Sequence, residues 1–530
     1  MHNKKIYWFI AIYFVIAAFP INFIPLFETT EARYAEIAWE MVKTGDFVEP
    51  RFNGIKHFHK PPFVYWINAI GMKLFGVNGF GARFFEVLAA GLILFVTYRL
   101  SEILLKNKNK SEASVYILSS SMLFIAVSRI VSTDIYLTLF TILAQYVLFK
   151  QIYYKKATSN SIFYGIFLGL GFLTKGPIIF LFTILPFILC KFFDSSHRKV
   201  FSFKDVILST STFLIISLPW YIAVIIKNPE LLNYFLKVQT VDRVATNRFH
   251  RYQPFYFFFA IFAGTFFPYI VPFIKGLKDS LKAFRQKISL FVYIIVPFII
   301  FTISKSKLAT YILPFYPLAS IIAAEYLDAN MINSRLFKSL SIIYACIFPL
   351  VLLVAPFVYV DLREYYIPIA AYLILSIILL VNIIKKFNLL NFTMFIIFSS
   401  FCIYSLLPVL GPNIKGYKKM TEQIISLDPQ KKHEVLTYKS FIPSISFYRQ
   451  KITVAALGKE REVQFEDNNE YKKYYIDSKK DLENFFLDHN SFFLVTNDKY
   501  INEIESYGYK CTLHFKQRKD SMYFCEKQNL

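Results

Sequence analysis

Acidic residues are scarce in this sequence. The 530 residues include 36 Asp and Glu against 59 Lys and Arg, which gives a formal net charge of +23. A basic excess of this size raises the question of a nucleic-acid partner. The basic residues lie in short loops between apolar runs, however, and no basic stripe with interleaved aromatic residues lies outside those runs. We therefore expect no nucleic-acid partner.

A signal-peptide cleavage site is also lacking. The first apolar run, from about Ile6 to Phe27, is longer than a usual signal-peptide core. It is followed by the charged stretch Glu28 to Glu40, with no A-x-A-like site. We interpret this run as a retained first transmembrane helix.

Long apolar runs are abundant. Hydrophobic residues make up 55% of the chain and the mean hydropathy is +0.43. Each run is comparable to the roughly 20 apolar residues that span a bilayer, and one soluble core would have to hide all of them at once. The sequence thus predicts an all-α polytopic membrane protein with about thirteen spans. They lie near 6–27, 81–102, 113–131, 134–151, 160–174, 177–193, 206–226, 255–275, 289–304, 308–326, 338–360, 365–384 and 391–410.

Loop charges predict the orientation of these spans. With Lys4 and Lys5 in the cytoplasm, every second loop is also cytoplasmic and carries several Lys or Arg residues, as the positive-inside rule requires. The segments 28–80 and 227–254 and the tail after Gly411 then lie outside. We expect a membrane domain over 1–410 and a small extracytoplasmic α/β domain over 411–530.

The first outer segment, 28–80, is expected to contain two surface helices. Over 30–45 the apolar residues recur at helical spacing, with Thr30 as N-cap and Gly45 as stop. The residues predicted to face away from that apolar side are Glu36, Glu40 and Lys43. Phe63 to Phe75 is apolar but too short to span easily, which predicts a second surface or re-entrant helix.

Two cysteines lie in the tail. Cys511 and Cys525 flank strand-like runs, and a hairpin centred near Arg518 would place them opposite each other. In an oxidising compartment they would form a disulfide, and two free thiols are the alternative.

Polar groups near the ends of the spans are the candidate site residues, because charged groups at a membrane boundary are expensive and usually functional. Each has a plainer interpretation: Glu28 and Glu31 as an ordinary helix start, lysines that snorkel to headgroups, Asp134 as a helix cap and His59 as an interfacial histidine. What favours function is that carboxylates and cations gather on one predicted side. They form four groups: Glu28 to Tyr34; His57 to Pro62; Arg129 with Asp134; and Lys175 to Pro177 with Arg243, Arg248, His250, Arg251 and Ser304 to Tyr311.

These motifs resemble a known family. The run Thr30 to Met41, then Gly45-Asp46, Asn53-Gly54 and Lys60-Pro61-Pro62, is similar to the first outer loop of the aminoarabinose transferases. That family is grouped with the protein O-mannosyltransferases among the GT-C membrane glycosyltransferases. Further matches follow in the family's order: Asp134 with Leu137, Thr174 to Pro177, His250 to Phe255 and Ser306 to Pro314, with a loose match at Ser446-Phe447-Tyr448.

The resemblance implies a sugar transferase that acts on the outer face of a bacterial inner membrane. It implies an undecaprenyl-type polyprenyl-phosphate sugar donor and a hydroxyl or phosphate acceptor on lipid A, another glycolipid, a glycan or a protein. An inverting transfer needs a carboxylate base and cations for the leaving phosphate. We expect Glu31 as the base, with Glu28 and Asp134 as alternatives. The expected donor-binding residues are Arg33, Lys60, Lys175, Arg251, Lys307 and Tyr311.

The chain departs from the family pattern at two positions. Relatives often carry Asp-Glu where this chain has Thr30-Glu31, so the base is in doubt if the family uses the first acid. His59 stands where relatives place Glu before Lys-Pro-Pro. A divalent cation, Zn or Mg, is a possibility there, with His59 and His250 as ligands.

Two other functions stay open on the sequence. A transporter or flippase of lipid-linked glycans also needs many spans and cations, but its ionisable residues would lie at mid-bilayer. Here Glu31, Lys60 and Lys307 fall at predicted outer helix ends, which favours surface chemistry. A glycan ligase or polymerase is the third alternative.

Overall fold

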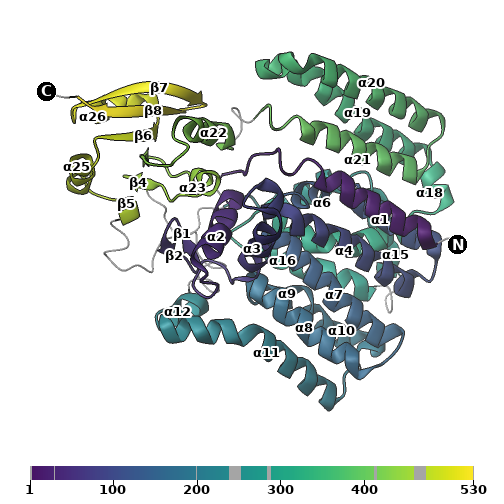
Figure 1. Cartoon of the computed structure of the whole chain (residues 1–530). Coiled ribbons are helices and arrows are strands. Elements are labelled where there is room, and N and C mark those ends of the chain that lie inside the picture. Colours follow the sequence, from purple (N-terminus) through teal and green to yellow (C-terminus); the bar gives the residue numbers. More distant parts are fainter. Residues whose placement is uncertain are drawn as a thin grey trace. The chain divides into compact units, whose positions relative to one another are not determined.

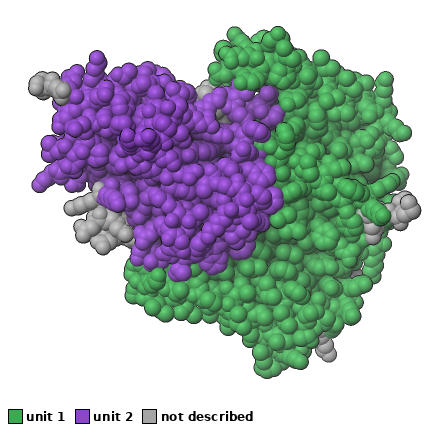
Figure 2. All heavy atoms as spheres, in the orientation of Figure 1, with its two compact units in different colours: residues 1–20, 86–404 green, residues 21–85, 405–530 purple. Residues whose placement is uncertain are grey.

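A computed structural model of the chain describes residues 3–28, 30–198, 200–237, 252–282, 288–410, 415–458 and 473–528. The chain divides into two compact units (Figure 2). Unit 1 contains residues 1–20 and 86–404, and unit 2 contains residues 21–85 and 405–530. The predicted first outer segment is thus grouped with the tail, and each unit is described by itself.

All the secondary structure in the described residues of unit 1 is helical (Figure 1). Its long elements are joined by short helices and 3-10 turns. They are α1 (Asn3–Ala18), α4 (Gly79–Leu105, which begins in unit 2), α5 (Lys108–Ser119), α6 (Met122–Val127), α7 (Thr133–Tyr153), α8 (Thr158–Lys175), α9 (Ile178–Phe182), α10 (Ile184–Phe193), η1 (Ser195–His197), α11 (Phe203–Lys227), α12 (Leu231–Asn233), α14 (Phe257–Thr265), α15 (Ile270–Lys282), α16 (Ile288–Ile303), η3 (Ala309–Phe315), α17 (Tyr316–Tyr326), α18 (Ala329–Asn333), α19 (Arg335–Val358), η4 (Val360–Tyr365), α20 (Tyr366–Lys385) and α21 (Leu389–Ser405).

Five helical segments in the described part of the chain are long and apolar enough to cross a membrane: α4, α7, α11, α19 and the joined η4–α20. A sixth is counted if α14 and α15 form one span, although the chain bends by 116° between them. The predicted count of about thirteen is therefore not confirmed. Several predicted spans are divided in the structure; 113–131 becomes α5 and α6, and 308–326 becomes η3 and α17.

Two glycines let α8 approach α11 closely in unit 1 (Figure 1). A Cβ atom on Gly165 would lie 2.1 Å from the Ser209 carbonyl oxygen, and one on Gly169 would lie 2.8 Å from the Ile216 side chain. The spacing of four residues places both glycines on one face of α8. Small residues at this spacing let helices pack backbone to backbone in membranes.

Unit 2 begins with the outer segment. It contains α2 (Thr30–Thr44), a hairpin of β1 (Arg51–Phe52) and β2 (Ile55–Lys56), and α3 (Phe63–Phe75). Gly45, at a φ of +74°, ends α2 as predicted, and α3 has the predicted bounds. Asn53 and Gly54 form the two-residue turn with φ values of 51° and 85°, which matches the turn type that favours Asn-Gly in hairpins.

The tail forms a six-stranded mixed sheet in the order β5-β4-β3-β6-β8-β7 (Figure 1). β3, β4, β5 and β6 are parallel, whereas β8 runs antiparallel to both of its neighbours. An α/β fold is therefore present, as predicted. Its elements are α22 (Lys418–Leu427), β3 (Glu434–Tyr438), α23 (Pro443–Arg449), β4 (Val454–Ala456), β5 (Tyr475–Ile476), α25 (Lys479–Asp488), β6 (Ser491–Thr496), η6 (Asp498–Tyr500), α26 (Ile501–Glu505), β7 (Tyr509–Gln517) and β8 (Asp520–Lys527).

A disulfide joins the last two strands. Cys511 on β7 lies directly opposite Cys525 on β8, and the two sulfurs are bonded. Arg518, at a φ of 54°, lies in the turn between the strands. The disulfide alternative, rather than two free thiols, is confirmed.

The outer hairpin is bound to the tail sheet. The Asn53 side-chain amide donates to the Thr453 carbonyl at 2.9 Å, and the Ser446 hydroxyl donates to the Asn53 side-chain oxygen at 2.9 Å. Ile55 packs with Ala455 and Tyr475. Two motif fragments of the sequence, Asn53-Gly54 and Ser446 to Tyr448, therefore contact each other.

The prediction that Glu36 and Glu40 face away from the packed side of α2 is wrong. Every residue from Glu31 to Met41 is buried. Glu36 accepts a hydrogen bond from the Asn53 N–H at 3.2 Å, and Glu40 accepts one from the Gly54 N–H at 2.7 Å. Both carboxyls satisfy donors of the hairpin turn, so the helical periodicity mistook buried anchors for a solvated face.

We expect the stability of the protein to depend on pH because Glu36 and Glu40 are buried side by side. Burial, then the neighbouring Glu40, raises the pKa of Glu36 well above its ordinary 4.5. The folded state then binds more protons than the unfolded chain, so this stabilisation is complete below 4.5 and is lost as the pH rises through the raised pKa of Glu36. Glu36→Gln is expected to flatten this loss, because glutamine donates to Glu40 without titrating. Thermal unfolding across pH measures it, and equal pH dependence in both proteins would contradict it.

Candidate active site

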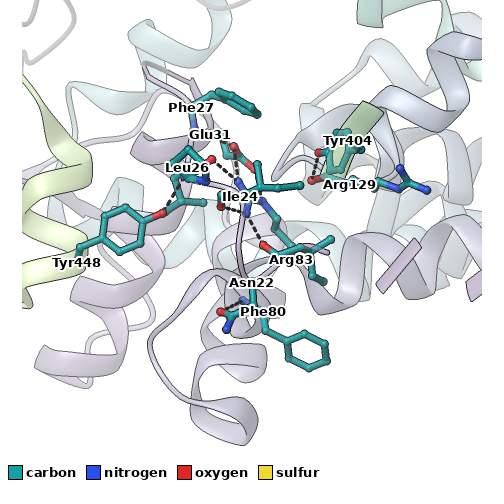
Figure 3. A network of polar contacts seen from close by, with 12 residues as sticks. Asn22, Ile24, Leu26, Phe27, Glu31, Phe80, Arg83, Arg129, Tyr404 and Tyr448 are labelled. Atoms are coloured by element: carbon teal, nitrogen blue, oxygen red, sulfur yellow. Dashed lines mark hydrogen bonds and ion pairs between the residues drawn. The ribbon is translucent and has the colours of Figure 1, made fainter. Parts of the chain in front are cut away.

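A buried arginine holds the start of the outer segment in unit 2 (Figure 3). Arg83, at the start of α4, donates to both carboxylate oxygens of Glu31, at 2.7 and 2.9 Å. The same guanidinium donates to the carbonyl oxygens of Ile21, Ile24 and Pro25 at 2.6 to 2.9 Å. Arg83 is fully buried and Glu31 is 2% exposed. This network fixes the chain that leads from residue 21 into α2.

Glu31, the first candidate base, is occupied by this network. Besides the two Arg83 contacts, its Oε2 atom accepts the Phe27 N–H at 2.9 Å. A carboxylate held bidentately by a buried guanidinium has little capacity left for a proton from an acceptor hydroxyl. Thr30 begins α2 and carries no carboxyl group. Both oxygens of Glu31 therefore accept hydrogen bonds within this network.

Glu28 has the geometry of a base. Its Oε1 atom accepts the Ser444 backbone N–H at 2.9 Å. Its Oε2 atom is buried and has no hydrogen-bond partner among the residues that the structure describes. Burial raises the pKa of Glu28 to about 7, against the lowering effect of the Ser444 hydrogen bond and the Arg33 charge. A carboxylate with one oxygen that accepts no hydrogen bond from the described residues, and with a pKa near neutrality, suits general-base chemistry.

Two cations and two imidazoles lie in the outer segment of unit 2. Arg33 is 8% exposed and lies over the Phe52 ring at 5.5 Å, and Lys60 is 5% exposed. The rings of His57 and His59 are 5.8 Å apart. Burial lowers the pKa of His57 well below 6.5, and the charges of Arg33 and Lys60 lower it further. His57 is therefore neutral and lies near two cations, Arg33 and Lys60. Such a setting attracts an anion.

The predicted metal site finds no support in the donor set of the described residues. No group of three His, Cys, Asp or Glu side chains there is arranged to hold a metal ion. His57 is surrounded by the positive charges of Arg33 and Lys60, which oppose a divalent cation. His250, the second predicted ligand, lies outside the described residues. No step below uses a metal.

Unit 1 brings together a second group of predicted residues. Lys175, at the end of α8, forms an ion pair with Asp134 in the first turn of α7. The Lys175 ammonium also lies 4.4 Å from the centre of the Tyr311 ring on η3. Ser132 is the N-cap of α7 and accepts the Asp134 N–H at 3.0 Å, so the plainer interpretation of Asp134 as the helix cap does not hold. Three motifs that are far apart in the sequence therefore meet.

Lys307 lies in the loop before η3. Its ammonium donates to the Gln253 carbonyl oxygen at 3.0 Å and is 5.8 Å from the Tyr252 ring. Burial lowers its pKa. The predicted donor-binding residue Arg251 lies outside the described residues, as do Arg243 and Arg248.

Sequence reasoning missed two contributors. Arg83 lies in the predicted span 81–102, and a charge at the start of an apolar run is itself a signal of a buried partner. Ser444 contributes a backbone N–H, which no side-chain motif reveals. Both contacts join residues more than 50 positions apart.

Comparisons with known proteins agree with the fold. Residues 59–222 match the family described as dolichyl-phosphate-mannose-protein mannosyltransferase. The resemblance to the aminoarabinose transferase-like GT-C proteins is confirmed, and the chain is a mostly helical, multi-pass membrane protein.

The individual relatives carry more specific descriptions. The undecaprenyl phosphate-alpha-4-amino-4-deoxy-L-arabinose arabinosyl transferases of Serratia proteamaculans and Aeromonas hydrophila are 29% and 30% identical over 62% and 61% of this chain. The matches span 60% of the length of these relatives. The crystal structure of ArnT from Cupriavidus metallidurans bound to undecaprenyl phosphate has a TM-score of 0.83 at 19% identity, over 99% of this chain and 98% of that one. The apo oligosaccharyltransferase of Archaeoglobus fulgidus is a more distant match, with a TM-score of 0.52 at 11% identity, over 98% of this chain and 74% of that one.

Proposed function

We propose that this protein is a membrane glycosyltransferase that moves a sugar from a polyprenyl-phosphate donor to an acceptor hydroxyl. The observation that carries the proposal is the cluster in unit 2, where Glu28 lies near Arg33 and both Arg33 and Lys60 act on buried His57. A carboxylate base beside fixed cations supplies the two groups that transfer from a lipid phosphate needs. The match to an ArnT structure with undecaprenyl phosphate supports the same donor class.

The reaction follows from these groups. Glu28 Oε2 takes the proton of the acceptor hydroxyl, and the hydroxyl oxygen forms a bond to the anomeric carbon of the donor sugar. The bond from that carbon to the phosphate oxygen breaks, and the electron pair leaves with the polyprenyl phosphate. Arg33 and Lys60 stabilise the charge on the departing phosphate. A single displacement of this kind inverts the configuration of the anomeric carbon.

Unit 1 is proposed to contribute donor contacts of its own. Lys175 and Lys307 are cations suited to a phosphate, and Tyr311 is a hydrogen-bond donor. The ion pair with Asp134 holds Lys175 in place, so Asp134 is proposed as its positioning residue. Arg251 retains its predicted donor-binding role.

The setting follows from the loop charges and the relatives. We propose a bacterial inner-membrane protein with a cytoplasmic N-terminus and the α/β domain on the periplasmic side, because the basic loops alternate and the disulfide suits an oxidising compartment. The acceptor belongs to one of four classes: lipid A, another glycolipid, a glycan or a protein. The predicted topology of about thirteen spans belongs to this proposal.

Lys60→Ala is expected to weaken binding of undecaprenyl phosphate about 10- to 100-fold, because a hydrogen bond to a charged group is lost. Lys73→Ala is the matched control, since Lys73 is an exposed cation of the same unit that stacks on Phe47 at 4.6 Å. Equilibrium binding of radiolabelled undecaprenyl phosphate to the detergent-solubilised proteins measures the difference. Equal affinities for the two variants would remove Lys60 from the phosphate site.

The function itself is tested with purified protein, a set of undecaprenyl-phosphate sugars and an extract of envelope lipids. Mass spectrometry should detect free undecaprenyl phosphate and a new glycosylated acceptor that appear together. No free undecaprenyl phosphate with any donor would overturn the proposed transfer. Comparison of envelope glycolipids and glycoproteins from wild-type and deletion strains then identifies the acceptor.

A further inference from the structure

Glu28 is held by the C-terminal α/β domain. The Ser444 N–H, at the start of α23, donates to Glu28 Oε1 at 2.9 Å, and the Glu28 N–H donates to the Lys415 carbonyl at 2.7 Å. Two residues earlier, the Leu26 N–H donates to the Tyr448 hydroxyl at 2.8 Å, also on α23 (Figure 3). The tail thus fixes both the backbone and the side chain of the candidate base.

α23 is itself rigidly attached to the tail domain. Arg449, at its end, is fully buried and donates to the Asp428 carboxylate at 2.9 Å and to the His433 carbonyl at 2.6 Å. Ser446, at its centre, donates to Asn53. Because α23 is anchored in this way, the Ser444 N–H has little freedom to move. A precise site requires this of its supporting residues.

We propose that the C-terminal domain is a positioning element for sugar transfer, in which the Ser444 N–H holds Glu28 Oε1 so that Oε2 is presented to the acceptor hydroxyl. This inference rests on the proposed function. It assigns Ser444 and Tyr448 as positioning residues, with no contact to substrate.

The electrostatic surroundings of Glu28 give this contact a measurable consequence. The charged and titratable groups that act on Glu28 are Arg33 and Glu31, and Tyr417 and Tyr448 of the tail also sense its charge. Burial raises the pKa of Glu28, and the Ser444 hydrogen bond lowers it. Loss of the N–H therefore raises this pKa further. Transfer needs ionised Glu28, so the acidic limb of the pH profile moves to higher pH.

Ser444→Pro removes this donor, and Ser444→Ala keeps it. Ser444 lies in the first turn of α23, where its N–H has no helical acceptor, so proline removes no helical hydrogen bond there. Ser444→Pro is expected to shift the acidic limb of kcat upward by about one pH unit, which is about tenfold in rate at low pH. The donor KM should stay unchanged, and Ser444→Ala should match the wild type. An unshifted limb in folded Ser444→Pro would overturn the inference.

A second variant covers the case in which Ser444→Pro does not fold. Tyr448→Phe removes the acceptor of the Leu26 N–H and loosens the same segment, so a smaller shift in the same direction is expected. A pH profile equal to that of the wild type would count against the inference. Failure of the proposed function gives a different result: Glu28→Gln would then transfer sugar at the wild-type rate, or no protein would transfer sugar at all.

Discussion

Glu28→Gln is expected to lower the rate of sugar transfer by about 10²- to 10⁴-fold, the range that a positioned general base contributes. Glutamine keeps the size of the side chain and can still accept the Ser444 N–H, but it cannot take the acceptor proton. Binding of the polyprenyl-phosphate donor should be nearly unchanged, because Glu28 is not among the residues that we assign to the phosphate. The measurement is kcat for transfer at saturating donor.

The matched control is Glu422→Gln, which makes the same charge change on a carboxylate that is 59% exposed, on α22 of the same unit. It should transfer sugar at the wild-type rate. A Glu28→Gln protein that is folded and fully active would remove Glu28 as the base. Asp134, held in its ion pair with Lys175 in unit 1, would then become the next candidate.

Arg83→Leu is expected to destabilise the protein by about 3–5 kcal/mol, because it leaves the buried Glu31 carboxylate without its cation. It also leaves the carbonyl oxygens of Ile21, Ile24 and Pro25 without their donor. Glu31→Leu leaves an unpaired buried guanidinium, but that guanidinium keeps the three carbonyl contacts. We therefore expect the larger loss from Arg83→Leu. Thermal unfolding in detergent measures the order.

Arg99→Leu is the control for this prediction. The Arg99–Glu102 ion pair is also 2.7 Å long, but its side chains are 42% and 29% exposed, and such a pair contributes less than about 1 kcal/mol. Its unfolding temperature should stay close to that of the wild type. If Arg83→Leu unfolded at the same temperature as Arg99→Leu, the network of Figure 3 would not be the support that we infer.

Local patterns in the sequence predicted local structure. Helical spacing and a following glycine predicted α2, and apolar length predicted α3. The separation of Cys511 and Cys525 around a polar centre anticipated their pairing across β7 and β8. Each of these depends on neighbours within about one turn or one hairpin, which the order of residues specifies directly.

Long-range contacts were not predictable in the same way. A helical wheel treats Glu36 and Glu40 as solvent-facing, because it contains no information on the hairpin turn that binds them. Glu31 was favoured as the base from its motif, but its partner Arg83 lies 52 positions away and takes both of its oxygens. Glu28 was only an alternative, because the N–H that orients it lies 416 positions away.

The count of spans shows the same limit. The count of about thirteen crossings stays a prediction, because a hydropathy pattern contains no information on where a helix breaks. The described residues place breaks inside several runs, such as the one between α14 and α15. Pro268 lies in the break between α14 and α15, and proline cannot donate the hydrogen bond that would continue a helix.

The most direct measurement uses a donor that carries one isotope in the phosphate and another in the sugar, with the protein reconstituted in liposomes that contain the acceptor. We expect the two labels to separate: the phosphate label stays on the polyprenyl lipid and the sugar label moves to the acceptor, at a rate that Glu28→Gln abolishes. If the labels instead crossed the bilayer together on one intact lipid, the protein would be a transporter and not a transferase.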